Sequence, residues 1–369
     1  MKESEKFEIG GEYNYSIENI SSNILENKNS LFEYIGINES NTILFNACSS
    51  AIKYLIENII PTTINRILLP SYLCSCITEV IEACNIEFEF YRVNQSLELD
   101  IYDLGNKLKG SGDCIFFINY FGFSQPQYII EYLNKIKETN LLIEDCTHSI
   151  FNKDACSRYI GHYQVASLRK WTGIPDGGIL IDKNNDLSRY KLNKGYDEFF
   201  VSRFIGHLMK DKYLKGGQID KNIFLSLFNN AEEAYDNEMN IFKISNISYK
   251  LLNSINYKKL MSKRNQNYKF LVENLNEIEY IEVIFKDIKE YTCPIGLPVI
   301  VKNINRDKFR KYLSYNGVYC PIHWIPDSYT NTNFEDTSIL SKKILTIPCD
   351  QRYSEIDMKY IIKTIKEYY

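Results

Sequence analysis

The sequence predicts an α/β protein with a mainly parallel sheet, followed by a smaller α+β unit. From about residue 40 to residue 181, apolar runs of strand length alternate with segments of helical period, which is typical of βαβ units with helices on both faces of the sheet. The length of 369 residues fits two domains better than one or three. We therefore expect an N-terminal segment with a large domain over residues 1–245 and a small domain over residues 246–369.

The elements of the first domain follow from this alternation. Strands are expected at residues 43–47, 67–69, 86–93, 114–121 and 141–146. Helices are expected between them at residues 50–60, 77–84 and 128–137. Because ligands of parallel sheets bind beyond the carboxyl ends of the strands, the functional residues are expected just after the apolar runs.

The alternation stops after residue 182. Residues 183–245 are polar and aromatic, have Gly216 and Gly217 in their middle and show no clean strand. One long helix is expected at 248–275. After it, strands are expected at 281–285, 296–301 and 318–320, around a helix at 306–315.

Composition and charge exclude several classes of protein. The 44% hydrophobic and 24% charged residues are ordinary for a globular chain. The net charge of -4 and a pI near 5.8 argue against a nucleic-acid partner or an anionic membrane surface. No apolar run approaches the ~18 residues of a membrane span, and residues 1–6 show no start of a signal peptide.

The ten cysteines lie mostly inside apolar segments, where a reduced cysteine behaves as a small hydrophobic residue. Cys74 and Cys76 are close together, but one C-x-C pair is weak support for a metal site, and no metal is expected. These features favour a reduced, cytoplasmic protein.

Four strand ends, or the turns after them, carry polar groups suited to a bound cofactor. At the first, Cys48, Ser49 and Ser50 open a helix, whose N-terminus offers N–H groups and the positive dipole end to a phosphate; a simple helix cap is the alternative. At the second, Asp145 ends an apolar strand and can hold a protonated ring nitrogen, with His148 in reach of the same ring. A capping aspartate and a buried structural histidine are the alternatives there.

The third strand end carries Lys170, three residues after Ser167. A lysine in a desolvated site can act as a Schiff-base nucleophile. Alternatively, Lys170 is a solvated surface charge, or it binds a phosphate group together with Arg169. At the fourth, the turn after Pro70 carries Tyr72 and Cys74, where a side chain can lie against a planar ring; a buried turn aromatic is the alternative.

In their order along the chain, with the turn after Pro70 second, the four elements resemble a fold-type I pyridoxal-phosphate enzyme, most closely the DegT/DnrJ/StrS family of sugar aminotransferases. The family pattern of a lysine, five intervening residues, an acidic residue and two glycines is matched by Lys170, Asp176, Gly177 and Gly178 without a gap. The resemblance continues through residues 317–324 and 345–353, so it covers about residues 40–365. It implies a mainly parallel seven-stranded sheet and a small C-terminal domain.

The resemblance also implies roles for individual residues. Lys170 would form the internal aldimine with pyridoxal 5'-phosphate and then move the proton between substrate and cofactor. Asp145 would pair with the pyridinium nitrogen, and His148 would contact the ring hydroxyl.

The remaining cofactor contacts are implied with departures from the family pattern. The phosphate would be held by Ser49, by the backbone of residues 48–50 and by Ser167, although Cys48 stands where the family usually has glycine. Either Tyr72 or Cys74 would stack on the ring. For the segment that reaches across the dimer interface in the family, the nearest equivalents are Asn240 and Lys243.

The activity implied is the transfer of an amino group from an amino acid donor, with glutamate expected, to a nucleotide-linked keto sugar. Such enzymes work as homodimers with the site between subunits, in pathways that make polysaccharides or specialised metabolites. Two alternatives stay open. One is a different small substrate or an elimination or decarboxylation on the same cofactor, and the other is a catalytically silent paralogue that only binds the cofactor.

Overall fold

The computed structural model describes residues 7–16, 30–64, 66–110, 112–153, 159–193, 195, 198–325 and 333–368. Residues 1–6, where the sequence predicts no signal peptide, lie outside this part of the chain. Within the described ranges, no helix is both long and apolar enough to cross a membrane.

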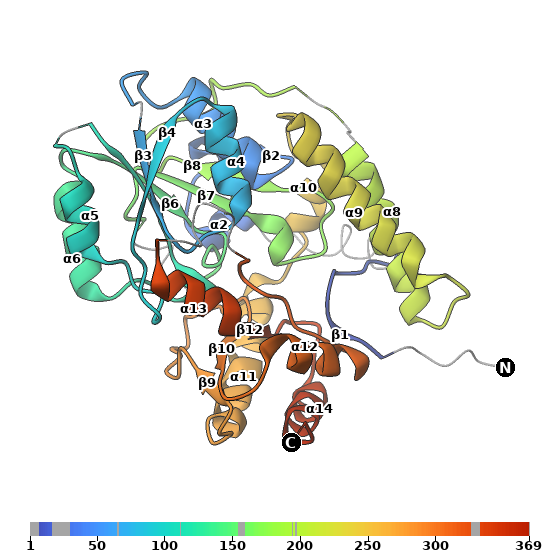
Figure 1. The fold of residues 1–369 in the computed structure, drawn as a ribbon. Helices are drawn as coiled ribbons and strands as arrows, with labels where there is room; N and C mark the ends of the chain where they lie inside the picture. Colours follow the sequence, from blue (N-terminus) through green and yellow to red (C-terminus); the bar gives the residue numbers. More distant parts are fainter. Residues whose placement is uncertain are drawn as a thin grey trace.

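The core of the larger part is a seven-stranded sheet with the order β2-β8-β7-β6-β5-β3-β4 (Figure 1). Neighbours from β4 to β7 are parallel, whereas β8 is antiparallel to both β7 and β2. The predicted mainly parallel sheet is therefore confirmed. Its strands are β2 (Thr42–Phe45), β3 (Arg66–Pro70), β4 (Glu87–Tyr91), β5 (Cys114–Ile118), β6 (Leu141–Asp145), β7 (Tyr163–Ser167) and β8 (Gly178–Ile181).

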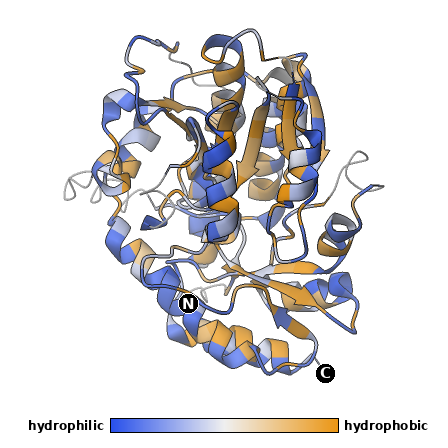
Figure 2. Cartoon of the chain, turned by 90° about the vertical axis from the view of Figure 1, so that its left-hand side faces the viewer, coloured by the Kyte–Doolittle hydropathy of each residue, from blue (hydrophilic) through white to orange (hydrophobic). Residues whose placement is uncertain are grey.

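Helices cover both faces of this sheet, as the apolar runs predict. Along β8, Leu180 belongs to one apolar cluster while Ile179 and Ile181 belong to another, because successive side chains point to opposite faces. Figure 2 shows these central strands as mainly hydrophobic. The first cluster is closed by α3 (Cys48–Asn58), α4 (Ser75–Ala83), α5 (Ile101–Lys107) and α6 (Gln127–Ile136), and the second by α2 (Leu31–Ile35) and α10 (Asn246–Leu252).

Two helices fill most of the stretch in which the sequence shows no strand. They are α8 (Glu198–Leu214) and α9 (Lys221–Glu238), and they pack against each other beside the large sheet (Figure 1). Gly216, with a φ of 88°, follows the end of α8, and the side chain of Asp220 caps the start of α9 by accepting from the N–H of Asn222.

The C-terminal part contains a three-stranded antiparallel sheet with the order β12-β10-β9. The short strand β1 (Ile9–Gly10) pairs in parallel with β11 (Val318–Tyr319), so the segment around residue 9 is attached to this part. The remaining elements are β9 (Ile281–Val283), β10 (Leu297–Val301), β12 (Ile344–Ile347), α11 (Tyr257–Leu275), α12 (Arg306–Tyr315), α13 (Glu335–Lys343) and α14 (Glu355–Lys366). The domain boundary at residue 245 stays a prediction.

The predicted single helix over residues 248–275 is wrong, because the structure has α10 and α11 in its place. The side chain of Asn256 accepts a hydrogen bond from the N–H of Lys259 and starts the second helix. The predicted strand 114–121 is also shorter than expected, since β5 ends at Ile118 and a 3₁₀ turn follows in which Phe121 has a φ of 55°.

Gly178 lets β8 lie close against the beginning of α3. A Cβ atom at this position would overlap the carbonyl oxygen of Ala47 and would lie 2.6 Å from the backbone nitrogen of Cys48. Both atoms belong to the backbone, so neither can move without shifting the first turn of α3. The second glycine of the Asp-Gly-Gly motif is therefore required by packing.

We expect Gly178→Ala to lower the free energy of unfolding by about 3 kcal/mol, because the added methyl group has no space. Gly105→Ala is the matched control, since its Cβ would meet only the mobile hydroxyl of Tyr132, 2.9 Å away. The control should change stability by less than about 1 kcal/mol. Urea unfolding of the three proteins measures the difference, and equal midpoints would contradict the packing argument.

Candidate active site

One pocket lies at the carboxyl ends of β5, β6 and β7, next to the first turns of α3 and α4. This is the edge of the sheet at which the sequence places ligand binding. The predicted residues that line the pocket are Cys48, Ser49, Cys74, Asp145, His148, Ser167 and Lys170. Ser50 and Tyr72 are buried and do not line it. The lining also contains Arg169, which the sequence offers only as an alternative phosphate-binding partner of Lys170, and the residues that sequence reasoning did not assign, namely Ile52, Cys76, Ile77, Ile118, Thr147 and Trp324.

Lys170 ends the 3₁₀ helix Leu168–Lys170, which directly follows β7. Among the described residues, its amine has no hydrogen-bond or ion-pair partner, and Nζ lies 6.0 Å from the centre of the Trp324 ring. The structure therefore leaves this amine available to a ligand in the pocket.

Asp145 is the last residue of β6, and its carboxylate is almost fully buried. Oδ1 accepts a hydrogen bond from the N–H of Thr147 at 2.7 Å. Burial raises the pKa of Asp145, while the hydrogen bonds from Thr147 and the charge of Lys170 oppose this shift. A cationic ring nitrogen would stabilise the ionised carboxylate.

Thr147 holds the two strand ends of the pocket together. Its hydroxyl oxygen accepts a hydrogen bond from the N–H of Ser167 at 3.0 Å, and its carbonyl accepts one from Trp171 Nε1 at 2.7 Å. Thr147 follows Asp145 by two residues, and the side chain of Asp145 accepts from its N–H in an Asx-type turn. This Asp-x-Thr spacing is the sequence signal that could have identified Thr147.

His148 is 1% exposed, and its Nδ1 accepts a hydrogen bond from the N–H of Phe121 at 3.4 Å. Burial lowers the pKa of His148 well below its ordinary value, and the charges of Lys170 and His323 lower it further. The neutral ring therefore carries its proton on Nε2, which is buried and has no hydrogen-bond partner among the described residues. Because His148 lines the pocket, this N–H is a candidate donor to a bound ligand.

Trp324 closes the pocket from the C-terminal part of the chain. Its indole ring is nearly parallel to the imidazole of His148, with an interplanar angle of 14° and 5.2 Å between ring centres. Tyr72 packs behind it, 5.4 Å from the indole, whereas Cys74 lies at the pocket wall. Of the two residues predicted to stack on a ring, Cys74 lines the pocket and Tyr72 does not.

The first turn of α3 has free backbone donors. Its N-cap is Ala47, which has no side chain that could accept a hydrogen bond from the first N–H groups. Ser50 points away from the pocket, because its hydroxyl bonds to Tyr235 Oη at 2.6 Å and to the carbonyl of Asn240 at 3.2 Å. Of Ser50, only the backbone is therefore available for the predicted contact with a phosphate group.

Arg169 brings a second cation to the pocket. Its Nη1 donates to Glu232 Oε1 at 3.0 Å, while its Nε is buried without a hydrogen-bond partner among the described residues. Glu232 also pairs with Arg203 at 2.6 Å, and Arg203 reaches Glu12 at 2.9 Å. The network thus links the pocket to α8, α9 and the N-terminal segment.

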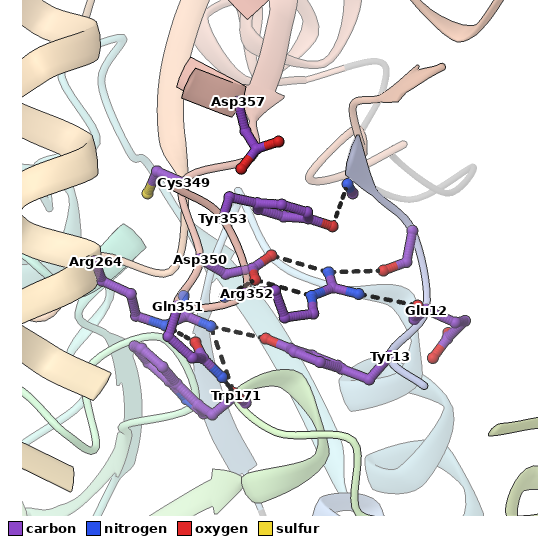
Figure 3. Close-up of polar contacts among 12 residues, drawn as sticks. Glu12, Tyr13, Trp171, Arg264, Cys349, Asp350, Gln351, Arg352, Tyr353 and Asp357 are labelled. Carbon is purple, nitrogen blue, oxygen red and sulfur yellow. Dashed lines mark hydrogen bonds and ion pairs between the residues drawn. The ribbon is translucent and has the colours of Figure 1, made fainter. Parts of the chain in front are cut away.

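Residues 345–353, which extend the family resemblance, hold the N-terminal segment in place (Figure 3). Arg352 pairs with Asp350 and donates to the carbonyl oxygens of Gly11 and Glu12, each at 3.2 Å. The hydroxyl of Tyr353 accepts a hydrogen bond from the N–H of Gly10 at 2.6 Å. This motif is therefore structural in the described chain.

A neighbouring pair of side chains fixes the loop that carries Lys170. Gln351 Nε2 and Arg264 Nη2 both donate to the carbonyl of Trp171, at 2.9 and 3.4 Å (Figure 3). Arg264 also lies over the Trp171 ring, 4.8 Å from its centre. The backbone next to Lys170 is thereby held from the C-terminal part of the chain.

No protein-family model and no curated protein matches the sequence. Among solved structures, the chain is similar to Helicobacter pylori PseC, described as an aminotransferase involved in the biosynthesis of pseudoaminic acid, with a TM-score of 0.69, 13% identity and 98% of each chain covered. It is also similar to the PLP form of Spr1654 from Streptococcus pneumoniae, with a TM-score of 0.67, 12% identity and 98% of each chain covered.

A third similar structure is a DegT DnrJ EryC1 StrS aminotransferase from Brucella abortus, with a TM-score of 0.61 and 16% identity. This match covers 96% of the present chain and 91% of the other. Over nearly its whole length, the chain therefore has the fold-type I architecture of these aminotransferases, as the resemblance predicts.

Because His207 of α8 is buried, we expect the free energy of unfolding to depend on pH. Its Nδ1 donates to the carbonyl of Tyr13 at 2.7 Å, and burial followed by the charge of Arg203 lowers its pKa to about 4. The unfolded chain, with a histidine pKa of about 6.5, binds more protons below that pH, so stability is lost as the pH falls from 6.5 towards 4.

We expect a change from pH 7.5 to pH 5.5 to cost about 1.4 kcal/mol through His207. His207→Gln should show a pH dependence that is smaller by this amount, whatever its absolute stability. Urea unfolding of both proteins at the two pH values measures this, and an unchanged pH dependence in the variant would refute the assignment.

Proposed function

We propose that the protein is a pyridoxal-phosphate-dependent aminotransferase that moves an amino group from an amino acid, with glutamate as the expected donor, to a nucleotide-linked keto sugar. The observation that carries the proposal is the meeting of Lys170, Asp145 and His148 in one pocket, next to the uncapped first turn of α3. The fold shared with known aminotransferases supports it.

The polar groups of the pocket fit this cofactor. The amine of Lys170 is available to the cofactor's aldehyde carbon, and Nε2–H of His148 is an unpartnered donor suited to the ring hydroxyl oxygen. The carboxylate of Asp145 suits the ring nitrogen, because a cation there offsets the cost of its burial. Cys74 and Trp324 supply the less polar walls of a planar slot.

When bound, the cofactor supplies an electron-withdrawing ring and an aldehyde carbon that accepts and returns an amino group. Asp145 would hold the ring nitrogen in its protonated form. Lys170 would act as the base that takes the proton from the substrate carbon and delivers it again, since its amine lines the pocket and has no hydrogen-bond or ion-pair partner among the described residues. Trp324 excludes water from the stacked side of His148.

The residues at the start of α3 would hold the phosphate group of the cofactor. The N–H groups of this helix, the hydroxyls of Ser49 and Ser167 and the guanidinium of Arg169 all belong to the same pocket. Cys48 stands at the position where the family usually has glycine. Arg169 adds a strong anion-binding group to the same site and would compensate for this departure.

The sugar acceptor is proposed from the solved structures of similar fold, since one of them, CalS13 from Micromonospora echinospora, is described as a sugar aminotransferase. Assembly as a homodimer and a cytoplasmic location stay predictions from the resemblance and from the sequence. Asn240 and Lys243 remain the nearest equivalents of cross-subunit residues, and the carbonyl of Asn240 bonds to Asn46 and Ser50 of its own chain.

Lys170→Ala should abolish the covalent attachment of the cofactor and slow amino transfer at least about 1,000-fold, because both depend on this amine. The visible absorption of the purified protein with pyridoxal phosphate, before and after excess glutamate, measures both effects. Lys183→Ala, an exposed lysine on the loop after β8, is the control and should behave as the wild type.

Wild-type protein that cannot be loaded with pyridoxal phosphate would refute the proposed function. A loaded protein whose spectrum is indifferent to glutamate, and to other amino acids, would favour elimination, decarboxylation or a silent paralogue over amino transfer.

Arg169→Gln should weaken the binding of pyridoxal phosphate by about 10- to 100-fold, because a charge-assisted hydrogen bond to the phosphate is lost. The affinity for pyridoxal, which has no phosphate, should stay unchanged. Absorbance titrations with both compounds measure the difference, and Arg169→Lys should recover part of the affinity. A loss of affinity that is equal for both compounds would show that Arg169 acts through the structure of the pocket.

A further inference from the structure

We propose that Cys74 and Cys76 form an oxidisable dithiol in the wall of the cofactor pocket, which a two-electron oxidant such as hydrogen peroxide converts into an intramolecular disulfide. Formation of the disulfide does not depend on the proposed function. Its predicted coupling to pyridoxal phosphate rests on that function.

The two thiols are already in contact. Cys76 Sγ donates to Cys74 Sγ at 3.2 Å, and both side chains line the pocket. Cys74 is the N-cap of α4 and Cys76 lies in its first turn, so both sulfurs lie at the positive end of a nine-residue helix. Helix N-termini and neighbouring cations are the surroundings in which cysteines become reactive.

The environment gives the two thiols different roles. The hydrogen bond from Cys76 lowers the pKa of Cys74 to about 6, with a further contribution from the charge of Lys170 against the opposing effect of burial. The pKa of Cys76 is raised well above its ordinary value by the same hydrogen bond and by burial. Cys74 is therefore the thiolate nucleophile, and Cys76 is the resolving thiol.

The other described thiols with a resolved shift differ from Cys74 in the direction of their pKa shift. Burial raises the pKa of every other thiol for which a shift is resolved. These are Cys48, Cys84, Cys114, Cys293, Cys320 and Cys349. Cys156 lies outside the described residues.

The oxidation balances with one molecule of peroxide. The Cys74 thiolate attacks one peroxide oxygen, the O–O bond breaks and hydroxide leaves, which gives a sulfenic acid on Cys74. The sulfur of Cys76 attacks that sulfur, the S–S bond forms and the second oxygen leaves as water with the proton of Cys76. The two sulfurs lose two electrons, peroxide becomes two waters, and a thiol reductant reverses the change.

Oxidation and cofactor binding should oppose each other. Cys74 occupies the wall against which the cofactor ring is proposed to lie, so a bound ring covers the dithiol. Conversely, the disulfide removes the thiolate whose negative charge faces Lys170 and changes the shape of that wall.

The test begins with the full-length protein free of cofactor, treated with hydrogen peroxide, quenched, alkylated and mapped by mass spectrometry. We expect one disulfide between Cys74 and Cys76, with a mass loss of about 2 Da, formed at least about 10-fold faster than any modification of Cys84. Cys76→Ser should stop at a sulfenic acid on Cys74, which dimedone traps. Cys84→Ser is the matched control, because this residue ends the same helix, and should behave as the wild type.

Preferential oxidation of Cys84, or a Cys74 that reacts no faster than Cys84, would overturn the dithiol assignment. In a second arm, saturation with pyridoxal phosphate should slow the disulfide at least about 10-fold. Binding of the cofactor without protection would overturn its placement over Cys74. A protein that does not bind the cofactor but still forms the disulfide would refute the proposed function alone.

Discussion

The buried guanidinium of Arg264 joins the parts of the chain that meet at the Lys170 loop. It is fully buried and donates to Tyr13 Oη and Gln351 Oε1, each at 2.7 Å, and to the carbonyl of Trp171. A buried charge is tolerated only when its donors are satisfied, so the N-terminal segment, α11 and the C-terminal segment must all be in place around it. The position of Lys170 therefore depends on residues far away in the sequence.

Burial determines the electrostatics of the pocket. It raises the pKa of Asp145 and lowers that of His148, so both side chains are shifted towards their neutral forms. The charge of Lys170 opposes the shift of Asp145 and adds to that of His148. A protonated heterocycle bound beside Asp145 would compensate for its desolvation, while His148 is ready to donate a hydrogen bond without a change of protonation.

Local periodicity explains both the correct and the wrong predictions of secondary structure. The strand before Asp145 was predictable because this buried strand begins as a continuous apolar run. The helix α8 was not, since its buried face includes Arg203, His207 and Lys210, which are held by ion pairs and hydrogen bonds with the N-terminal segment. The single helix over residues 248–275 was wrongly predicted because apolar residues keep their helical spacing through residues 253–256. In the structure, Asn253 ends α10 and Asn256 caps the start of α11.

The class of fold and the order of the candidate site residues can be read from the sequence alone, because strand and helix periods and the Lys170–Gly178 spacing are local properties of the chain. Which side chains face the pocket, and in which protonation state, follows from tertiary contacts. Ser50 turns towards Tyr235, Arg169 is set by Glu232 on α9, and His148 is kept neutral under Trp324. Orientation and desolvation depend on neighbours that are distant in sequence, and no local pattern encodes them.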